Sequence, residues 1–288
     1  MTHPAVSFEF FPPKSLEASF RLWDCVATLA PFDPSFVSVT YGAGGTTREL
    51  THEAVCILQD KKALRVAAHL TCVDATQAET LAIAQGYASA GVTDIVALRG
   101  DPPQKDASFR QTKDGFASSI DLITALAKTD TFNIMVGAYP EKHPQAADQT
   151  ADIDYLKAKL DAGASSAITQ FFFEAETFFR FRDKCVKAGI TAPIIPGILP
   201  IENWAGVQKF SAACGTTIPP LLRDAFTKAT RDGSTALLAT AVATELCDEL
   251  TTGGVDHLHF YTLNRPELTR DVCAALGLVP QRHLQNVA

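Results

Sequence analysis

Short apolar segments recur along the chain and alternate with longer segments of helical character. Several of the apolar segments are nearly uninterrupted, as expected for parallel strands that helices cover on both faces. They lie at residues 5–11, 35–40, 65–71, 94–98, 132–138, 166–172, 193–199 and 256–261. The pattern therefore predicts eight strands.

Helical segments separate the predicted strands. We expect helices at residues 15–30, 48–61, 76–90, 115–128, 148–162, 174–188, 202–213 and 266–276. Asp74, followed by Glu79, predicts the start of the third helix. Three glycines are expected to end helices in the left-handed backbone conformation: Gly91, Gly163 and Gly189. Segment 217–252, rich in Ala, Thr and Leu, predicts extra helices between strands seven and eight.

Eight strands with intervening helices close most economically into an α/β fold of the (β/α)8 TIM barrel type. A doubly wound open sheet is the alternative. The chain of 288 residues has a length typical of one such barrel. It contains no Pro/Gly/Ser-rich linker and no low-complexity tract, so we expect residues 1–288 to form a single domain.

Composition and charge exclude several classes of function. The net charge of −7 argues against a nucleic-acid-binding surface. No segment approaches the 18 or more apolar residues of a membrane span, and strand-like sequence begins directly after Met1–Pro4, which leaves no room for a signal peptide. The seven cysteines are scattered without a Cys-x-x-Cys pair, as in reduced proteins. We therefore expect a cytoplasmic protein that binds neither nucleic acid nor membranes.

The first predicted strand carries one carboxylate, Glu9, among Phe8, Phe10 and Phe11. Burial disfavours the charged form of a carboxyl, so an apolar site would raise the pKa of Glu9 toward neutrality. A carboxyl of that kind is suited to general acid catalysis. The alternative is that Glu9 faces water on an edge strand.

Polar residues follow most of the predicted strands, where the catalytic rim of a barrel lies. They include Glu9, Thr40, His69, Arg99, Asp101, Tyr139, His143, Gln170, Tyr261 and Arg265. The glycines at 42–45 resemble the start of a dinucleotide fingerprint, but the third glycine and its acidic partner are missing, so a flexible turn explains them better. Arg99 and His69 are suited to hold a phosphate or ribose, and an Arg99–Asp101 ion pair is the alternative for that loop.

Two further features have a structural and a functional interpretation. Lys157 and Lys159 on a predicted helix form either a solvated face or a phosphate contact. His257 and His259 share one face of the last strand, but no third ligand lies near them, so we expect no metal site.

Eight motifs, in order, resemble the methylenetetrahydrofolate reductase family. They are VSFEFFPPK, FVSVTYGAGG, AHLTC, IVALRGDPP, AYPEKHPQA, DAGA followed by AITQFFF, IIPGILP and HFYTLNR, and they span residues 6–265. The resemblance implies a barrel enzyme with noncovalent FAD. It would reduce 5,10-methylenetetrahydrofolate to 5-methyltetrahydrofolate with NADH or NADPH, in a ping-pong cycle of one-carbon metabolism that serves methionine biosynthesis.

The resemblance also implies roles for individual residues. Glu9 matches the general acid that assists ring opening to a 5-iminium cation, and Asp101 matches the carboxylate near the flavin and pterin. Matched FAD contacts are Thr40, His69, Arg99, Gly100, Asp101, Phe116, Ala117, Tyr139, His143, Ala146, Asp152 and Lys159. Matched folate and nicotinamide contacts are Gln170, Phe210, Tyr261 and Arg265, with Phe210 as a stacking group and Arg265 as a partner for the substrate's glutamate carboxylate.

The sequence departs from the family pattern at three positions. Tyr155 and Ala158 replace Asn and Arg, which puts contacts to the phosphate end of FAD in doubt. Gly206 replaces a glutamine that contacts folate, and the role of that glutamine passes either to Gln208 or to no residue. The chain resembles the short bacterial form without a regulatory domain, and we expect NADH as the reductant and a homo-oligomer. The competing hypotheses are a non-redox folate-binding one-carbon transferase barrel and a catalytically silent interaction module.

Overall fold

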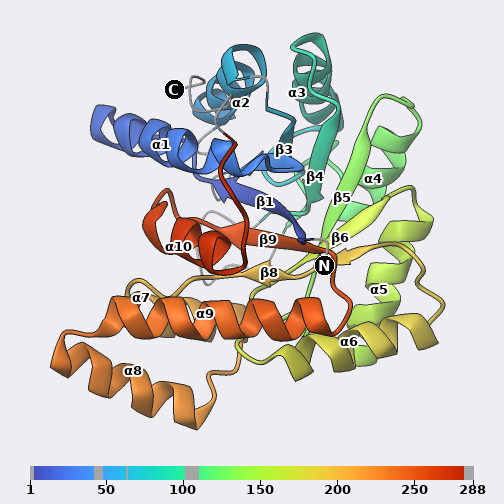
Figure 1. Cartoon of the computed structure of the whole chain (residues 1–288). Helices are drawn as coiled ribbons and strands as arrows, with labels where there is room; N and C mark the ends of the chain where they lie inside the picture. The colour runs from blue at the N-terminus through green and yellow to red at the C-terminus, as the bar shows by residue number, and fades with distance from the viewer. Residues whose placement is uncertain (1–2, 42–47, 63, 101–109, 282–288) are drawn as a thin grey trace.

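Nine short strands form one parallel sheet in the computed structural model, which describes residues 3–41, 48–62, 64–100 and 110–281. The strands are β1 (Ala5–Phe10), β2 (Phe36–Val39), β3 (Val66–Thr71), β4 (Asp94–Leu98), β5 (Asn133–Ala138), β6 (Ser166–Thr169), β7 (Ile194–Ile195), β8 (Gly197–Ile198) and β9 (His257–Tyr261). Their order in the sheet is β7-β6-β5-β4-β3-β2-β1-β9-β8. All pairs are parallel, and helices surround them (Figure 1).

The sheet closes on itself at Pro196, which separates β7 from β8. The continuous strand predicted at 193–199 is therefore wrong: proline has no N–H, so the hydrogen-bond ladder is interrupted there. β7 pairs with β6, β8 pairs with β9, and the Pro196 carbonyl accepts from the His259 N–H at 3.0 Å. Together the two short strands occupy one strand position of the barrel, between β6 and β9. The predicted (β/α)8 TIM barrel is confirmed.

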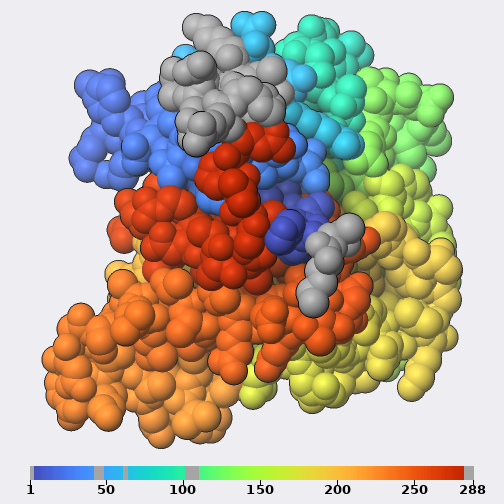
Figure 2. Space-filling view, in the orientation of Figure 1, coloured from blue at the N-terminus to red at the C-terminus, as the bar shows by residue number. Residues whose placement is uncertain are grey.

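The helices follow the predicted alternation. They are α1 (Leu16–Leu29), α2 (Arg48–Lys62), α3 (Gln77–Ser89), α4 (Ser119–Ala127), α5 (Gln149–Asp161), α6 (Ala175–Lys187), α7 (Trp204–Cys214), α8 (Pro220–Asp232), α9 (Thr235–Thr252) and α10 (Glu267–Ala275), with a 3-10 turn, η1 (Ala30–Phe32). The extra helices predicted in 217–252 are α8 and α9: α8 projects at one end of the molecule, whereas α9 lies along the barrel beside α10 (Figures 1 and 2). No helix in the described part of the chain is long and apolar enough to cross a membrane.

Two predicted helix starts are wrong. α3 begins at a capping box in which Thr76 accepts from the Glu79 N–H, whereas Asp74 lies in a left-handed turn with φ 51°. α4 begins at Ser119 rather than 115, because the Ser118 side chain accepts from the Asp121 N–H and caps the helix there. The predicted left-handed glycines are confirmed, with φ of 82°, 120° and 82° at Gly91, Gly163 and Gly189.

Alternation along β1 separates its phenylalanines from its carboxylate. Phe8 and Phe10 point outward and are buried in the main core between the barrel and its helices. Ser7 and Glu9 point to the other face of the strand, into the barrel. A smaller apolar cluster fills part of the barrel interior, from Phe36, Ala67, Val96, Met135, Ile168 and Ile195. Glu9 therefore lies in the barrel interior, on the opposite side of the strand from Phe8 and Phe10.

Candidate active site

Two histidines from other strands approach Glu9 inside the barrel. His69 Nε2, from β3, lies 3.3 Å from Glu9 Oε2, and His259 Nε2, from β9, lies 3.8 Å from the same atom. The Glu9 side chain is only 15% exposed. Neither ring nitrogen makes a hydrogen bond of good geometry among the described residues, so these contacts are electrostatic. Glu9 is a buried carboxylate with two imidazole neighbours.

The histidines reverse the predicted effect of burial on Glu9. Desolvation raises the pKa of this carboxyl, but His259 and His69 together outweigh it and lower the pKa to about 2. The prediction of a raised pKa is therefore wrong. Its error was to count sequence neighbours on a strand, which point away, instead of the side chains that face Glu9 across the barrel.

Ser7 joins His257 and His259 beneath Glu9. Its hydroxyl lies 2.7 Å from His259 Nδ1 and 3.0 Å from His257 Nε2. Burial, and then the proximity of His259, lower the pKa of His257 to about 4. The two histidines that share a strand face are thus parts of a hydrogen-bonded column below the carboxylate. Among the described residues, no group of three potential ligands is arranged to hold a metal ion.

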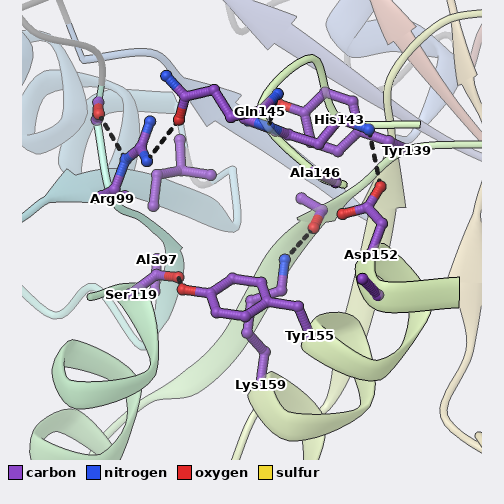
Figure 3. Close-up of a pocket in the computed structure, with 14 residues that line it drawn as sticks. Ala97, Arg99, Ser119, Tyr139, His143, Gln145, Ala146, Asp152, Tyr155 and Lys159 are labelled. Atoms are coloured by element: carbon purple, nitrogen blue, oxygen red, sulfur yellow. Dashed lines mark hydrogen bonds between the residues drawn. The ribbon is translucent and has the colours of Figure 1, made fainter. Parts of the chain in front are cut away.

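A pocket of about 430 Å³ opens beside the barrel axis, between the ends of β4 and β5 and the helices α4 and α5 (Figure 3). Its volume is in the range of small-molecule and cofactor sites. It is lined by Ala97, Leu98, Arg99, Gly100, Ser119, Gly137, Tyr139, His143, Gln145, Ala146, Ala151, Asp152, Tyr155 and Lys159. The structure thus brings together these predicted cofactor contacts: Arg99, Gly100, Tyr139, His143, Ala146, Asp152 and Lys159.

Helix α5 contributes one face to this pocket. Asp152, Tyr155 and Lys159 are spaced by three and four residues, which places them on the same side of the helix. The Asp152 carboxylate accepts from the His143 N–H at 2.8 Å, and the Lys159 ammonium donates to the Gly137 carbonyl (Figure 3). Burial lowers the pKa of Lys159 to about 8. The other lysine, Lys157, instead pairs with the exposed Asp161, so only Lys159 is placed for a phosphate.

Gly100 allows a close approach of the backbone at the pocket wall. Its φ is 87°, and a Cβ there would come within 2.6 Å of the Val73 side chain. The neighbouring Arg99 donates to Gln145 Oε1 at 2.8 Å. Asp101, and the glycine loop after β2, lie outside the described residues.

The remaining predicted FAD contacts surround the pocket or lie apart from it. His69 adjoins Glu9, as described above. Thr40 directly follows β2, and its carbonyl accepts from the Thr51 hydroxyl at 3.1 Å. Phe116 is buried in the main core and Ala117 is exposed, and neither lines the pocket.

The predicted substrate contacts occupy the rim on the side of β6 and β9. Gln170 donates to Cys214 Sγ at 3.4 Å, and Phe210 on α7 is 49% exposed. The Tyr261 hydroxyl donates to the Thr169 carbonyl at 2.6 Å, and burial raises the pKa of this phenol well above its usual value. Arg265 pairs with Glu202 at 3.2 Å. Tyr261 and Arg265 therefore have protein partners already.

Several residues of the site were missed by the sequence prediction. Ser119 and Gln145 in the pocket and Ser7 below Glu9 were not named, whereas Tyr155, His257 and His259 were named without a role in the site. Two periodicities point to two of these residues: the three- and four-residue spacing from Asp152 and Lys159 indicates Tyr155, and alternation with Glu9 on one strand face indicates Ser7.

The model of the methylenetetrahydrofolate reductase family matches residues 1–277. The chain belongs to this family. It is 44% identical over 276 residues to the 5,10-methylenetetrahydrofolate reductase of Escherichia coli (strain K12), covering 96% of this chain and 91% of that protein. The enzyme of the same name from Pectobacterium carotovorum subsp. carotovorum is 42% identical over the same shares of both chains.

More distant similarities extend to plants and to a solved structure. Methylenetetrahydrofolate reductase (NADH) 1 of Arabidopsis thaliana is 36% identical over 295 residues, which cover 98% of this chain and 50% of that protein. A solved structure of a Clostridium thermocellum protein, described as binding two copies of 5-methyl-5,6,7,8-tetrahydrofolic acid, matches with a TM-score of 0.61. It is 14% identical and covers 96% of this chain and 94% of that one, so it supports the shared fold alone.

Proposed function

We propose that this protein reduces 5,10-methylenetetrahydrofolate to 5-methyltetrahydrofolate, with FAD as the bound cofactor and NADH as the preferred reductant. The observation that carries the proposal is the position of Glu9. This carboxylate lies inside the barrel one residue before the end of β1, on the rim where the pocket at the ends of β4 and β5 also opens. Family membership supports the reaction class.

The residues of the pocket fit an anionic dinucleotide. The ammonium of Lys159 is buried there, the Arg99 guanidinium faces the same space, and the first turns of α4 and α5 border it through Ser119 and Asp152 (Figure 3). Cations and helix N-termini favour phosphate groups. When bound, FAD would supply the carrier that takes hydride from the nicotinamide and gives it to the folate.

Glu9 would hold the proton that the folate needs at N10 for ring opening. At its low pKa this carboxyl is ionised at neutral pH. The proton would therefore reach Glu9 Oε2 once bound ligands cover the rim, because loss of water raises a carboxyl pKa. His69 Nε2 and His259 Nε2, at 3.3 and 3.8 Å, are the neighbouring groups placed to deliver it.

The decisive experiment separates the two half-reactions. Anaerobic bleaching of the flavin by NADH or NADPH, followed by reoxidation with methylenetetrahydrofolate, tests the redox function. We expect Glu9→Gln to retain reduction by NADH and to slow reoxidation by folate about 10²–10⁴-fold. Glu17→Gln, which neutralises an exposed carboxylate on α1, is the control.

Three results would contradict the proposal. A protein that stays colourless with FAD would not be a flavoenzyme. Folate binding without any bleaching by a reduced nicotinamide would favour the non-redox transferase barrel. Equal loss of both half-reactions in Glu9→Gln would assign this residue a structural role.

A further inference from the structure

The outer end of the pocket is closed by a pair of hydroxyl groups. Tyr155, on α5, and Ser119, at the first position of α4, have their oxygens 3.0 Å apart (Figure 3). Tyr155 is 38% exposed, so part of it remains available to a ligand, whereas Ser119 is buried. This end differs from the family pattern, because Tyr155 and Ala158 stand where Asn and Arg are usual.

The position of Glu9 determines which half of a flavin dinucleotide would reach this end. Glu9 lies inside the barrel, whereas Tyr155 and Ser119 lie on the helices outside it. A reacting flavin ring must be near the barrel axis to share a substrate with Glu9. The half of the dinucleotide that does not react then extends toward α4 and α5.

A buried cation lies between these two ends. Lys159 Nζ is 5.6 Å from the centre of the Tyr155 ring, and the lysine side chain is one helical turn further along α5. One of the three ammonium protons is used by the Gly137 carbonyl, and no other hydrogen bond of this group is found among the described residues. The remaining ammonium protons of Lys159 are suited to bind a diphosphate. Tyr155 would then lie next to the group that is attached to the far side of that diphosphate.

We propose that Tyr155 and Ser119 bind the adenosine half of FAD and make the pocket select FAD over FMN. The proposal rests on the proposed function, since it requires a flavin in this pocket. Tyr155 offers an aromatic face for the adenine, and an aromatic side chain stacks on the face of any base. The two hydroxyls offer donors and acceptors to the ribose or the base edge. FMN lacks the adenosine and gains nothing from either residue.

The alternative is that Tyr155 is only a brace. Its hydrogen bond to Ser119 joins α5 to α4, so its removal would loosen the pocket as a whole. A brace and a ligand contact differ in one measurable respect. Loosening the pocket weakens every flavin, whereas loss of an adenosine contact weakens FAD alone.

The test is the ratio of FAD and FMN dissociation constants, measured by fluorescence titration of flavin-free protein. We expect Tyr155→Ala to weaken FAD binding on the order of tenfold, as for loss of one stacked base, and to leave FMN binding unchanged. Tyr155→Phe and Ser119→Ala retain the ring and should lose only a few-fold in FAD affinity. Phe20→Ala, which removes an exposed aromatic ring from α1, is the matched control.

The outcomes separate this proposal from the proposed function. Equal weakening of FAD and FMN in Tyr155→Ala would make Tyr155 a brace and overturn the proposal, while the flavin assignment would stand. An unchanged ratio of FAD and FMN dissociation constants in all three variants would also overturn the proposal. Failure of the unsubstituted protein to bind any flavin would overturn both. Thermal unfolding of each flavin-free variant identifies misfolding, and the two conservative variants decide the matter if Tyr155→Ala does not fold.

Discussion

Arg265 and Glu202 form an ion pair at the rim of the barrel, with Arg265 Nη1 3.2 Å from Glu202 Oε2. The guanidinium side chain is 59% exposed and the carboxylate side chain 17%. Burial raises the pKa of Glu202, and the proximity of Arg265 opposes this. The residue expected to bind a carboxylate of the substrate is therefore already paired with a carboxylate of the protein.

Removing the charge of Glu202 should release Arg265 to the substrate. We expect Glu202→Gln to lower the KM for methylenetetrahydrofolate by about 1.5- to 5-fold without changing kcat, because ion pairs near a protein surface are worth about 0.2–1 kcal/mol. Steady-state kinetics at constant ionic strength measures this change in KM. Glu176→Gln breaks a more exposed pair with Arg180, far from the rim, and should have no effect. An unchanged KM in Glu202→Gln would show that Arg265 does not bind the substrate's carboxylate.

Cofactor affinity should depend on pH through Lys159. The pKa of this ammonium is lowered to about 8 by burial, and a bound diphosphate would raise it again. FAD affinity should therefore be greatest below pH 8 and fall by up to about tenfold per pH unit above it, since binding must then take up a proton. Fluorescence titrations with FAD at a series of pH values test this.

A pair of lysine variants provides the control for that pH dependence. Lys159→Gln should bind FAD weakly with a flat profile above pH 8, whereas Lys157→Gln should keep the profile of the unsubstituted protein. A profile that persists in Lys159→Gln would assign the pH dependence to another group.

Glu9 should make the stability of the protein sensitive to acid. Its pKa is lower in the folded protein, about 2, than the ordinary value of 4.5, so its ionised form favours folding. This contribution is fully present above about pH 4.5 and is lost as the pH falls toward 2. We expect the free energy of unfolding of Glu9→Gln, measured in urea, to lack a pH-dependent part on the order of 1–3 kcal/mol over this interval. An identical pH dependence in both proteins would mean that the histidines do not lower this pKa.

Gly197 should tolerate no side chain. A Cβ there would lie 2.1 Å from the Thr169 carbonyl oxygen and 2.6 Å from the Tyr261 ring, and both are held in place by their own hydrogen bond. We expect Gly197→Ala to destabilise the protein by roughly 3 kcal/mol or more, or to prevent folding, as overpacking against backbone does. The measurement is the urea midpoint together with the yield of folded protein.

Gly206 is the matched control for this substitution. It lies inside α7, and a Cβ would meet nothing closer than 3.4 Å. Gly206→Ala should stabilise the protein by about 0.5–1 kcal/mol through helix propensity. Equal effects of the two substitutions would contradict the packing argument at the barrel closure.

The alternation of apolar strands and helices was sufficient to predict the barrel, because each strand carries its own signal. Local details depended on competing groups. Pro196 interrupts a segment that otherwise looks like a continuous strand, and Thr76 caps α3 where Asp74 was expected, since hydrogen bonding to Glu79 favours the later start. Helix and strand boundaries are determined by such single interactions, which periodicity does not resolve.

The candidate site was predictable to a different degree. Arg99 and Tyr139 meet in one pocket because strand ends converge on one rim, and Lys159 reaches the same pocket from α5. The pKa of Glu9 could not be predicted from the sequence, since it depends on His69 and His259. These residues are distant in the chain and approach Glu9 only across the barrel.

The pairing of β1 with β9 also has a consequence for how the protein is made. Ser7 and His259, which adjoin Glu9, are 252 residues apart in sequence and meet only when these two strands pair. During synthesis, β1 leaves the ribosome well before β9, so Glu9 emerges long before its partner His259. Until then β1 presents an unpaired edge, open to pairing with other chains. Completion of the surroundings of Glu9 and removal of this aggregation hazard are thus the same late event.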